Sequence, residues 1–199
     1  MTPLTSLTST VAPLLRDNVD TDTIIPSREM KSTGRTGLAD GLFAPWRYTE
    51  GREPDPAFVL NRPEFSAATI LAGGANFGCG SSREHAVWAL AEYGIRCIIA
   101  PSFAPIFAAN CIRNGVLPVV LPRDAVEEVS GQEATVDLAT QSVTMESKSW
   151  HFAIEAEPKE MLLEGLDVIS LTLKSQPEIE AWTRQDRARR PWVYLESRG

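Results

Sequence analysis

The sequence has 199 residues, which is typical of a single domain with a substantial hydrophobic core. Its formal net charge of −7 argues against nucleic acid as the main partner. No apolar run reaches membrane-spanning length, and residues 1–10 lack the regions of a signal peptide. The three cysteines contain no CxxC pair, which argues against a disulfide framework and a closed zinc site and fits a reducing cytoplasm.

The N-terminal part is predicted to begin with a strand near residues 7–11, followed by a polar loop. The loop carries Asp17, Asp20 and Asp22, three acids that could be taken for a calcium site. A calcium-binding loop that began at Asp20 would need a closing glutamate where Lys31 stands. Calcium binding is therefore excluded.

Two irregular segments follow this loop. Residues 26–40 contain serine, threonine and glycine without apolar periodicity, which predicts a flexible loop. Such a loop can be a simple connector, but loops on rigid scaffolds also carry specificity. Residues 41–61 are rich in proline and aromatic side chains and are predicted to form a long surface excursion packed on the core.

The most informative stretch runs from Asn76 to Leu90. The apolar runs at 67–72 and 95–100, on either side of it, are typical of buried strands. Between them, apolar residues recur at helical spacing, and Gly94 stands where the helix would end. A crossover of this length predicts that the two strands are parallel.

Four glycines crowd the loop between the first of these strands and the helix: Gly73, Gly74, Gly78 and Gly80. Glycine costs backbone entropy, so the crowding indicates a backbone that comes close to another group. The carboxyl end of a parallel strand is also where α/β proteins place ligands, and a helix start favours an anion. Neither a Walker loop nor a dinucleotide fingerprint fits, because Cys79 and Arg83 stand at positions that those motifs reserve for other residues.

Two interpretations of the segment Ser81-Ser82-Arg83-Glu84 remain open. Ser81 and Glu84 have the spacing of a capping box, in which each side chain satisfies a backbone N–H at the start of a helix. Helix capping does not account for the glycines, or for an arginine beside two hydroxyl groups. An arginine beside two hydroxyl groups suits the binding of a carboxylate.

The C-terminal half is predicted to contain, in chain order, a helix within 101–115, a strand at 116–121, a hairpin within 134–154, and helices at 158–164 and 177–190. The pattern of 166–173 fits either a helix or a strand. We expect structural roles for Asn110 and His151. No repeat or linker is apparent, so residues 1–199 are predicted to form one domain, with a core at about 11–174 and a helical tail at 175–199.

The segment from Asn76 to Ala86, Asn-Phe-Gly-Cys-Gly-Ser-Ser-Arg-Glu-His-Ala, resembles the signature of the swivelling domain of the aconitase superfamily. Within that superfamily the chain resembles the small subunits of 3-isopropylmalate dehydratase, through further motifs at 18–26, 35–37, 58–61, 115–118 and 163–173. The resemblance spans roughly residues 11–182. It implies an α/β fold of three layers, β/β/α, with a central parallel sheet and added antiparallel strands.

The resemblance implies a hydro-lyase that isomerises 2-isopropylmalate and 3-isopropylmalate by dehydration and rehydration in leucine biosynthesis. Expelling hydroxide, a poor leaving group, calls for a Lewis-acidic metal. Two histidines and three widely spaced cysteines make no convincing iron–sulfur site, so this chain is expected to bind no metal itself. The resemblance supplies a large subunit that holds a [4Fe-4S] cluster as the partner.

The resemblance also implies the roles of individual residues. Ser81 matches the general base, and Asp22 matches an acid that orients a histidine of the partner subunit. A helix N-terminus beside Arg83 would stabilise the anionic form of Ser81. Four residues match substrate-binding positions: Ser82, Arg83, Arg35 and Thr21. Cys79 matches no cluster ligand and is expected to be a small buried residue.

Two alternatives accompany this interpretation. The chain departs from the commoner bacterial pattern at Glu29-Met30, where a large apolar pair is usual and which lies in the segment over the variable side chain of the substrate. A paralogous hydro-lyase acting on another 2-hydroxydicarboxylate, such as citramalate, is therefore one alternative. A stand-alone anion-binding module without catalytic activity is the other.

Overall fold

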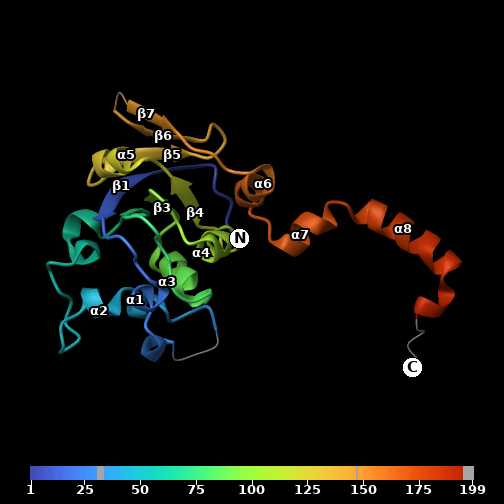
Figure 1. The fold of residues 1–199 in the computed structure, drawn as a ribbon, viewed down its shortest axis with the longest axis horizontal. Helices are drawn as coiled ribbons and strands as arrows, with labels where there is room; N and C mark the ends of the chain where they lie inside the picture. The colour runs from blue at the N-terminus through green and yellow to red at the C-terminus, as the bar shows by residue number, and fades with distance from the viewer. Residues whose placement is uncertain (31–33, 147, 195–199) are drawn as a thin grey trace.

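The computed structural model describes residues 1–30, 34–146 and 148–194, and these are organised around one curled sheet of seven strands (Figure 1). The strands are β1 (Ser6–Leu14), β2 (Ile70–Gly73), β3 (Cys97–Ala100), β4 (Leu117–Val120), β5 (Glu133–Asp137), β6 (Ser142–Met145) and β7 (Lys148–His151). Their order is β4-β3-β2-β1-β5-β6-β7. The four strands from β4 to β1 are parallel, whereas β1, β5, β6 and β7 pair antiparallel, so β1 belongs to both parts.

The helices connect the parallel strands, pack on the sheet, or form an extension at the C-terminal end. They are α1 (Thr21–Ile24), α2 (Ala44–Arg47), α3 (His85–Tyr93), α4 (Pro105–Arg113), α5 (Arg123–Val129), α6 (Ala156–Glu164), α7 (Val168–Leu173) and α8 (Gln176–Arg189). Helix α3 joins β2 to β3, and α4 joins β3 to β4, as expected for parallel strands that need a crossover.

Side chains alternate along the parallel strands and supply two separate cores. Leu71 and Ile98 belong to the core that contains Leu90 of helix α3. Their neighbours Ile70 and Ile99 belong to a second core, which contains residues of α5 and of the antiparallel strands. The order of layers is thus helices, parallel sheet and antiparallel strands, which confirms the predicted three-layer β/β/α arrangement.

The structure confirms most of the predicted elements. The strand–helix–strand unit is present and parallel, and α3 ends at Gly94, which has a φ of 111°. The predicted hairpin is present as β5 and β6, but a third strand, β7, extends it, and α5 was not predicted at all. The ambiguous stretch 166–173 forms helix α7, because the carboxylate of Asp167 accepts a hydrogen bond from the backbone N–H of Ser170 and caps its first turn.

The helical tail predicted at 177–190 is present as α8. Together with α7 it extends away from the sheet as an arm (Figure 1). Helix α7 buries none of its residues, and Ile169 and Trp182 are among the large apolar side chains that the arm exposes. Within the described part of the chain, no helix combines the length and the apolar character that crossing a bilayer requires.

Candidate active site

Two loops that follow neighbouring parallel strands interlock at the carboxyl edge of the sheet. The loop after β1 and the loop after β2 exchange backbone hydrogen bonds, from the N–H of Gly78 to the carbonyl of Val19 at 2.7 Å and from the N–H of Thr21 to the carbonyl of Cys79 at 2.8 Å. A further backbone bond joins the N–H of Asn18 to the carbonyl of Ala75 at 2.8 Å. Residues about 60 positions apart therefore share one rigid edge.

The glycines of the second loop make this interlocking possible. A Cβ atom on Gly74 would lie 2.3 Å from the carbonyl oxygen of Arg16, and one on Gly78 would lie 2.1 Å from the ring of Phe107. Gly78 also has a φ of 75°, which other residues rarely adopt. The glycines thus do bring the backbone close to other groups, but those groups are the protein's own loop and an aromatic ring of α4.

The capping-box interpretation of Ser81 and Glu84 is wrong. Helix α3 begins at His85, its N-cap residue is Glu84, and no side chain caps it. Ser81 lies before the helix in an irregular segment, so the expected stabilisation of its anion by the first turn is also not observed. The hydroxyl of Ser81 is instead held by side chains.

Two side chains converge on the Oγ atom of Ser81. The Nε–H of Arg83 donates to it at 2.8 Å, and the Oγ1 atom of Thr21 lies 2.9 Å away. The hydroxyl of Thr21 already accepts a hydrogen bond from the backbone N–H of Ser81 at 3.0 Å, so its own proton is available for donation to Oγ. Thr21 is only 3% exposed, which fixes its hydroxyl toward Ser81 rather than toward solvent. A negative charge on this oxygen would be stabilised by both donors.

Arg83 is fixed by contacts from all three of its nitrogen atoms. Besides the bond to Ser81, its Nη1 donates to the hydroxyl of Ser27 at 2.8 Å, and its Nη2 forms an ion pair with Asp22. Its guanidinium plane is therefore oriented beside Ser81, with one edge toward an exposed carboxylate. No local sequence pattern pointed to Ser27, because its contact with Arg83 joins segments that are 56 residues apart.

Ser82 lies on the exposed side of the same segment. Its backbone carbonyl accepts a hydrogen bond from Nδ2 of the buried Asn110 at 3.2 Å, which ties the segment to α4 and supports the structural role expected for that asparagine. No described residue bonds to the hydroxyl of Ser82, so this group is open to a ligand. Cys79 is partly buried, and it contributes its backbone carbonyl to the interlocked loops.

The structure does not bring Arg35 to the other predicted site residues. Its guanidinium lies 5.1 Å from the centre of the ring of Trp88, on helix α3. The following residues are anchored to the same helix, because the carboxylate of Glu92 accepts hydrogen bonds from the backbone N–H groups of Gly37 and Leu38 at 2.6 Å each and of Ala39 at 2.9 Å. Burial acts to raise the pKa of Glu92, but these three donors hold it below its usual value.

Replacing Glu92 with glutamine is expected to release this loop. An amide would present an NH₂ group to a backbone N–H that now donates to a carboxylate oxygen. We expect trypsin to cleave after Arg35 about fivefold faster, since an exposed charge-assisted contact contributes about 1 kcal/mol or less. Glu127→Gln on α5 is the matched control, and equal cleavage rates in the two variants would contradict the anchoring role. In the wild type, the stabilisation of the loop by Glu92 should be fully present above pH 4.5, the pKa of its carboxyl group in the unfolded chain. It should be lost as the pH falls through the lower pKa of the folded state.

Glu29, the departure from the commoner pattern, is engaged elsewhere. Its side chain is only 6% exposed, and Nη1 and Nη2 of Arg52 donate to its two carboxylate oxygens at 2.9 Å and 3.0 Å. Arg52 belongs to the surface excursion, so this ion pair fastens residues 27–29 to it. The sequence pattern did not reveal Arg52 as the partner.

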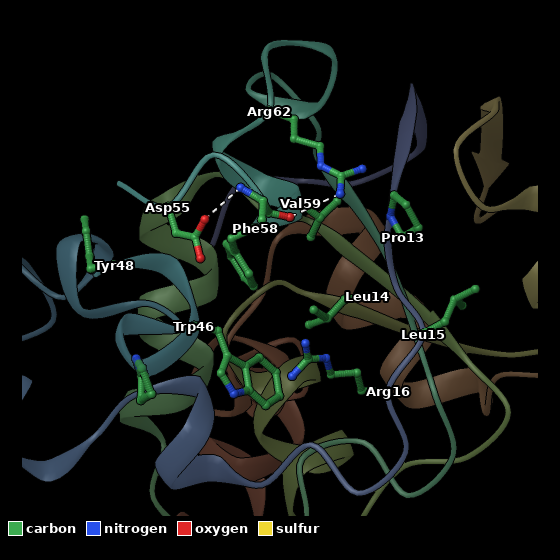
Figure 2. A pocket seen from close by; sticks show the side chains of 12 residues that line it. Pro13, Leu14, Leu15, Arg16, Trp46, Tyr48, Asp55, Phe58, Val59 and Arg62 are labelled. Carbon is green, nitrogen blue, oxygen red and sulfur yellow. Dashed lines mark hydrogen bonds between the residues drawn. The ribbon is translucent and has the colours of Figure 1, made fainter. Parts of the chain in front are cut away.

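A cavity of about 440 Å³ lies beside the end of β1, between that strand and the surface excursion (Figure 2). The guanidinium of Arg16 lies 4.3 Å from the ring centre of Trp46 at its edge. None of the six predicted site residues lines this cavity. The candidate site therefore rests on the Ser81 network and not on the cavity shown in Figure 2.

The described residues include no group of three or more histidine, cysteine, aspartate or glutamate side chains that could hold a metal ion. The three cysteines are free; Cys97 and Cys111 are fully buried, and burial raises the pKa of both thiols. These side chains do not fit a metal cluster.

Comparisons with known proteins show which family this chain resembles. The model of the aconitase C-terminal domain family matches residues 1–124. A 3-isopropylmalate dehydratase small subunit from Cupriavidus necator is 53% identical, over 98% of this chain and 100% of that protein, and one from Paramagnetospirillum magneticum is 47% identical, over 97% and 100%. A solved structure of 3-isopropylmalate dehydratase from Methanocaldococcus jannaschii has a TM-score of 0.68 and 27% identity, and covers 89% of this chain and 99% of its own.

Proposed function

The chain belongs to the aconitase C-terminal domain family and, within it, to the 3-isopropylmalate dehydratase small subunits, and from this premise we propose that Ser81 is the general base of the reaction. The activity is the isomerisation of 2-isopropylmalate and 3-isopropylmalate by dehydration and rehydration. The observation that carries the proposal is the convergence of Arg83 and Thr21 on the Oγ atom of Ser81.

The chemistry assigned to Ser81 is the transfer of one proton. The alkoxide of Ser81 takes the proton from the carbon next to the hydroxyl-bearing carbon, the electron pair of that C–H bond forms the C=C bond, and hydroxide leaves. In the return step, hydroxide adds to the double bond at the other carbon, and the hydroxyl of Ser81 gives its proton to the carbon that first carried the hydroxyl group. Hydrogen bonds from Arg83 and Thr21 lower the free energy needed to form the alkoxide of Ser81. Thr21, being buried, acts through Ser81 in this scheme.

The carboxylates of the substrate need positively charged and polar partners. Arg83 presents its fork beside Ser81, and the hydroxyl of Ser82 is open next to it, so these two residues bind one carboxylate in our proposal. The carboxylate competes with Asp22 for Nη2 of Arg83, which leaves Asp22 able to orient a histidine of the partner subunit. Arg35 joins the site by movement of its loop away from Trp88.

Departure of hydroxide is assigned to a partner subunit. Among the residues that the structure describes, no side chains form a ligand set for a metal cluster, and the name of the relatives, small subunit, supports a larger partner. We propose that this partner holds a [4Fe-4S] cluster, which supplies a Lewis acid for the leaving hydroxyl group. Three free cysteines fit assembly of the two subunits in a reducing cytoplasm.

The apolar side chain of isopropylmalate is compatible with Glu29. Because Arg52 binds both oxygens of its carboxylate, Glu29 does not present an uncompensated charge to a substrate. The reason to prefer citramalate over isopropylmalate is weakened accordingly.

The purified chain alone should be folded, colourless and without hydro-lyase activity. Addition of the iron–sulfur large subunit should restore hydration of the unsaturated dicarboxylate, because the two subunits then supply the base and the Lewis acid together. The assay measures consumption of the double bond by ultraviolet absorbance, and it compares the unsaturated dicarboxylates that form by dehydration of isopropylmalate and of citramalate. Turnover by the metal-free chain alone would refute the proposal that the partner subunit supplies the Lewis acid. A strong preference for the citramalate series would refute the substrate assignment.

A further inference from the structure

A second cavity, of about 430 Å³, lies at the opposite end of α3 from Ser81 and is lined by positive charge. It is enclosed by the N-terminal residues, the ends of α3 and α4, and the start of α7. Three arginines and one carboxylate line it, as do the first residues of the chain: Arg35, Arg96, Arg113, Asp167 and Met1. Such a concentration of cations is unexpected in a chain with a net charge of −7.

The three arginines of this cavity, Arg35, Arg96 and Arg113, form no ion pairs with the acids that the structure describes. Asp167, the one acid of the lining, accepts a hydrogen bond from the N–H of Ser170 at the start of α7, and its single negative charge offsets at most one of the three arginines. The N-terminal ammonium of Met1 adds a further charge near the cavity and donates to the carbonyl of Gly165 at 2.7 Å.

Arg96 is held in the wall of the cavity by backbone groups. Its Nε donates to the carbonyl of Gly115 at 3.2 Å and its Nη2 to the carbonyl of Thr2 at 2.9 Å. Partial burial lowers the pKa of this guanidinium, which shows that desolvation of the cation is not compensated by an acid. A fixed, partly desolvated cation is what an anion site requires.

A structural explanation covers only part of this arrangement. Arg113 lies in the last turn of α4, where a cation interacts favourably with the helix dipole. Arg96 fastens the N-terminal segment through the carbonyl of Thr2. Neither role explains why Arg35, from a distant loop, lines the same cavity.

We propose that this cavity is a binding site for a small multivalent anion, one that carries two or more carboxylate or phosphate groups. Arginine suits both groups because its planar fork donates two parallel hydrogen bonds. An anion bound here would hold Arg35 beside Trp88. Where Arg35 serves the substrate, as in the proposed function, the anion is therefore an inhibitor.

Calorimetric titration of the full-length chain tests the site directly. The probes are pyrophosphate and tricarballylate at low ionic strength. The probe that binds more tightly shows whether the site prefers phosphate or carboxylate groups. We expect Arg113→Gln to weaken binding at least about tenfold, as loss of one charge-assisted contact does. Arg184→Gln, the same change of charge on the exposed face of α8, is the matched control and should bind like the wild type.

Two further variants keep the test decisive. Arg35→Gln should weaken binding as Arg113→Gln does. Because Arg35 lies on an exposed loop, a loss of binding in this variant cannot be attributed to misfolding of a helix. Arg83→Gln should not weaken it, because Arg83 belongs to the Ser81 site. No binding of either probe, or binding that depends on Arg83 and not on Arg113, would overturn the proposal. Since binding is measured on the isolated chain, its outcome is independent of whether Ser81 is the base.

Discussion

The Ser81→Ala variant should lose catalytic turnover while the fold remains intact. The substitution removes the one oxygen on which Arg83 and Thr21 converge, and no described side chain replaces it. Loss of a general base typically lowers kcat by about 10²- to 10⁴-fold, and we expect the upper part of that range. Stability should fall by only about 1 kcal/mol, because Ser81 is partly exposed and does not cap helix α3.

The measurement is kcat of the reconstituted two-subunit enzyme, together with the melting temperature of the small subunit and its affinity for the large one. Ser82→Ala is the informative comparison, because its hydroxyl is proposed to bind substrate. That variant should mainly raise KM. A Ser81→Ala enzyme that keeps the wild-type kcat would eliminate Ser81 as the base.

Replacing Arg83 with lysine should severely impair the enzyme on both 3-isopropylmalate and citramalate. Arg83 contacts Ser27, Asp22 and Ser81 through three different nitrogen atoms, and a single ammonium group cannot reproduce that geometry. Loss of a charge-assisted contact costs roughly 1.5–3 kcal/mol, or about ten- to more than a hundredfold in kcat/KM.

Two other arginine-to-lysine variants serve as comparisons for Arg83→Lys. Arg123→Lys alters an ion pair with Asp17 that lies outside the site, and it should retain nearly full activity. Arg35→Lys should have an effect that differs between the two substrates, because Arg35 reaches the site only by movement of its loop. If Arg83→Lys behaved like the wild type on both substrates, Arg83 would be a surface residue and the site would have to be reassigned.

Local patterns in the sequence were sufficient for the parallel half of the fold. The apolar runs around β2 and β3 and the terminating Gly94 are signals contained within a few residues. Helix α5 and strand β7 were missed; β7 buries none of its residues, so its sequence shows no strong apolar alternation. The capping-box spacing was misleading because the chain turns into α3 four residues after Ser81.

Local patterns indicated the segment around Ser81, but not which residues it meets in the fold. Its contacts join Thr21 to Ser81 and Ser27 to Arg83 across more than 50 residues, and no local periodicity encodes such pairings. The same limit applies to the anchoring of residues 37–39 by Glu92 and to the Arg52–Glu29 ion pair. These contacts depend on how loops meet at the edge of the sheet, which follows from the tertiary fold.

The position of β1 in the sheet has a consequence for synthesis of the chain. β1 is the first strand to be made, yet Val11 pairs with Ile70 and Leu7 pairs with Val136, so its two neighbours are made much later. A chain emerging from the ribosome must keep residues 6–10 of β1 without their partner until β5 has been translated. A fragment ending at residue 124, before β5, would expose β1 as an open edge strand and should associate with other copies of itself.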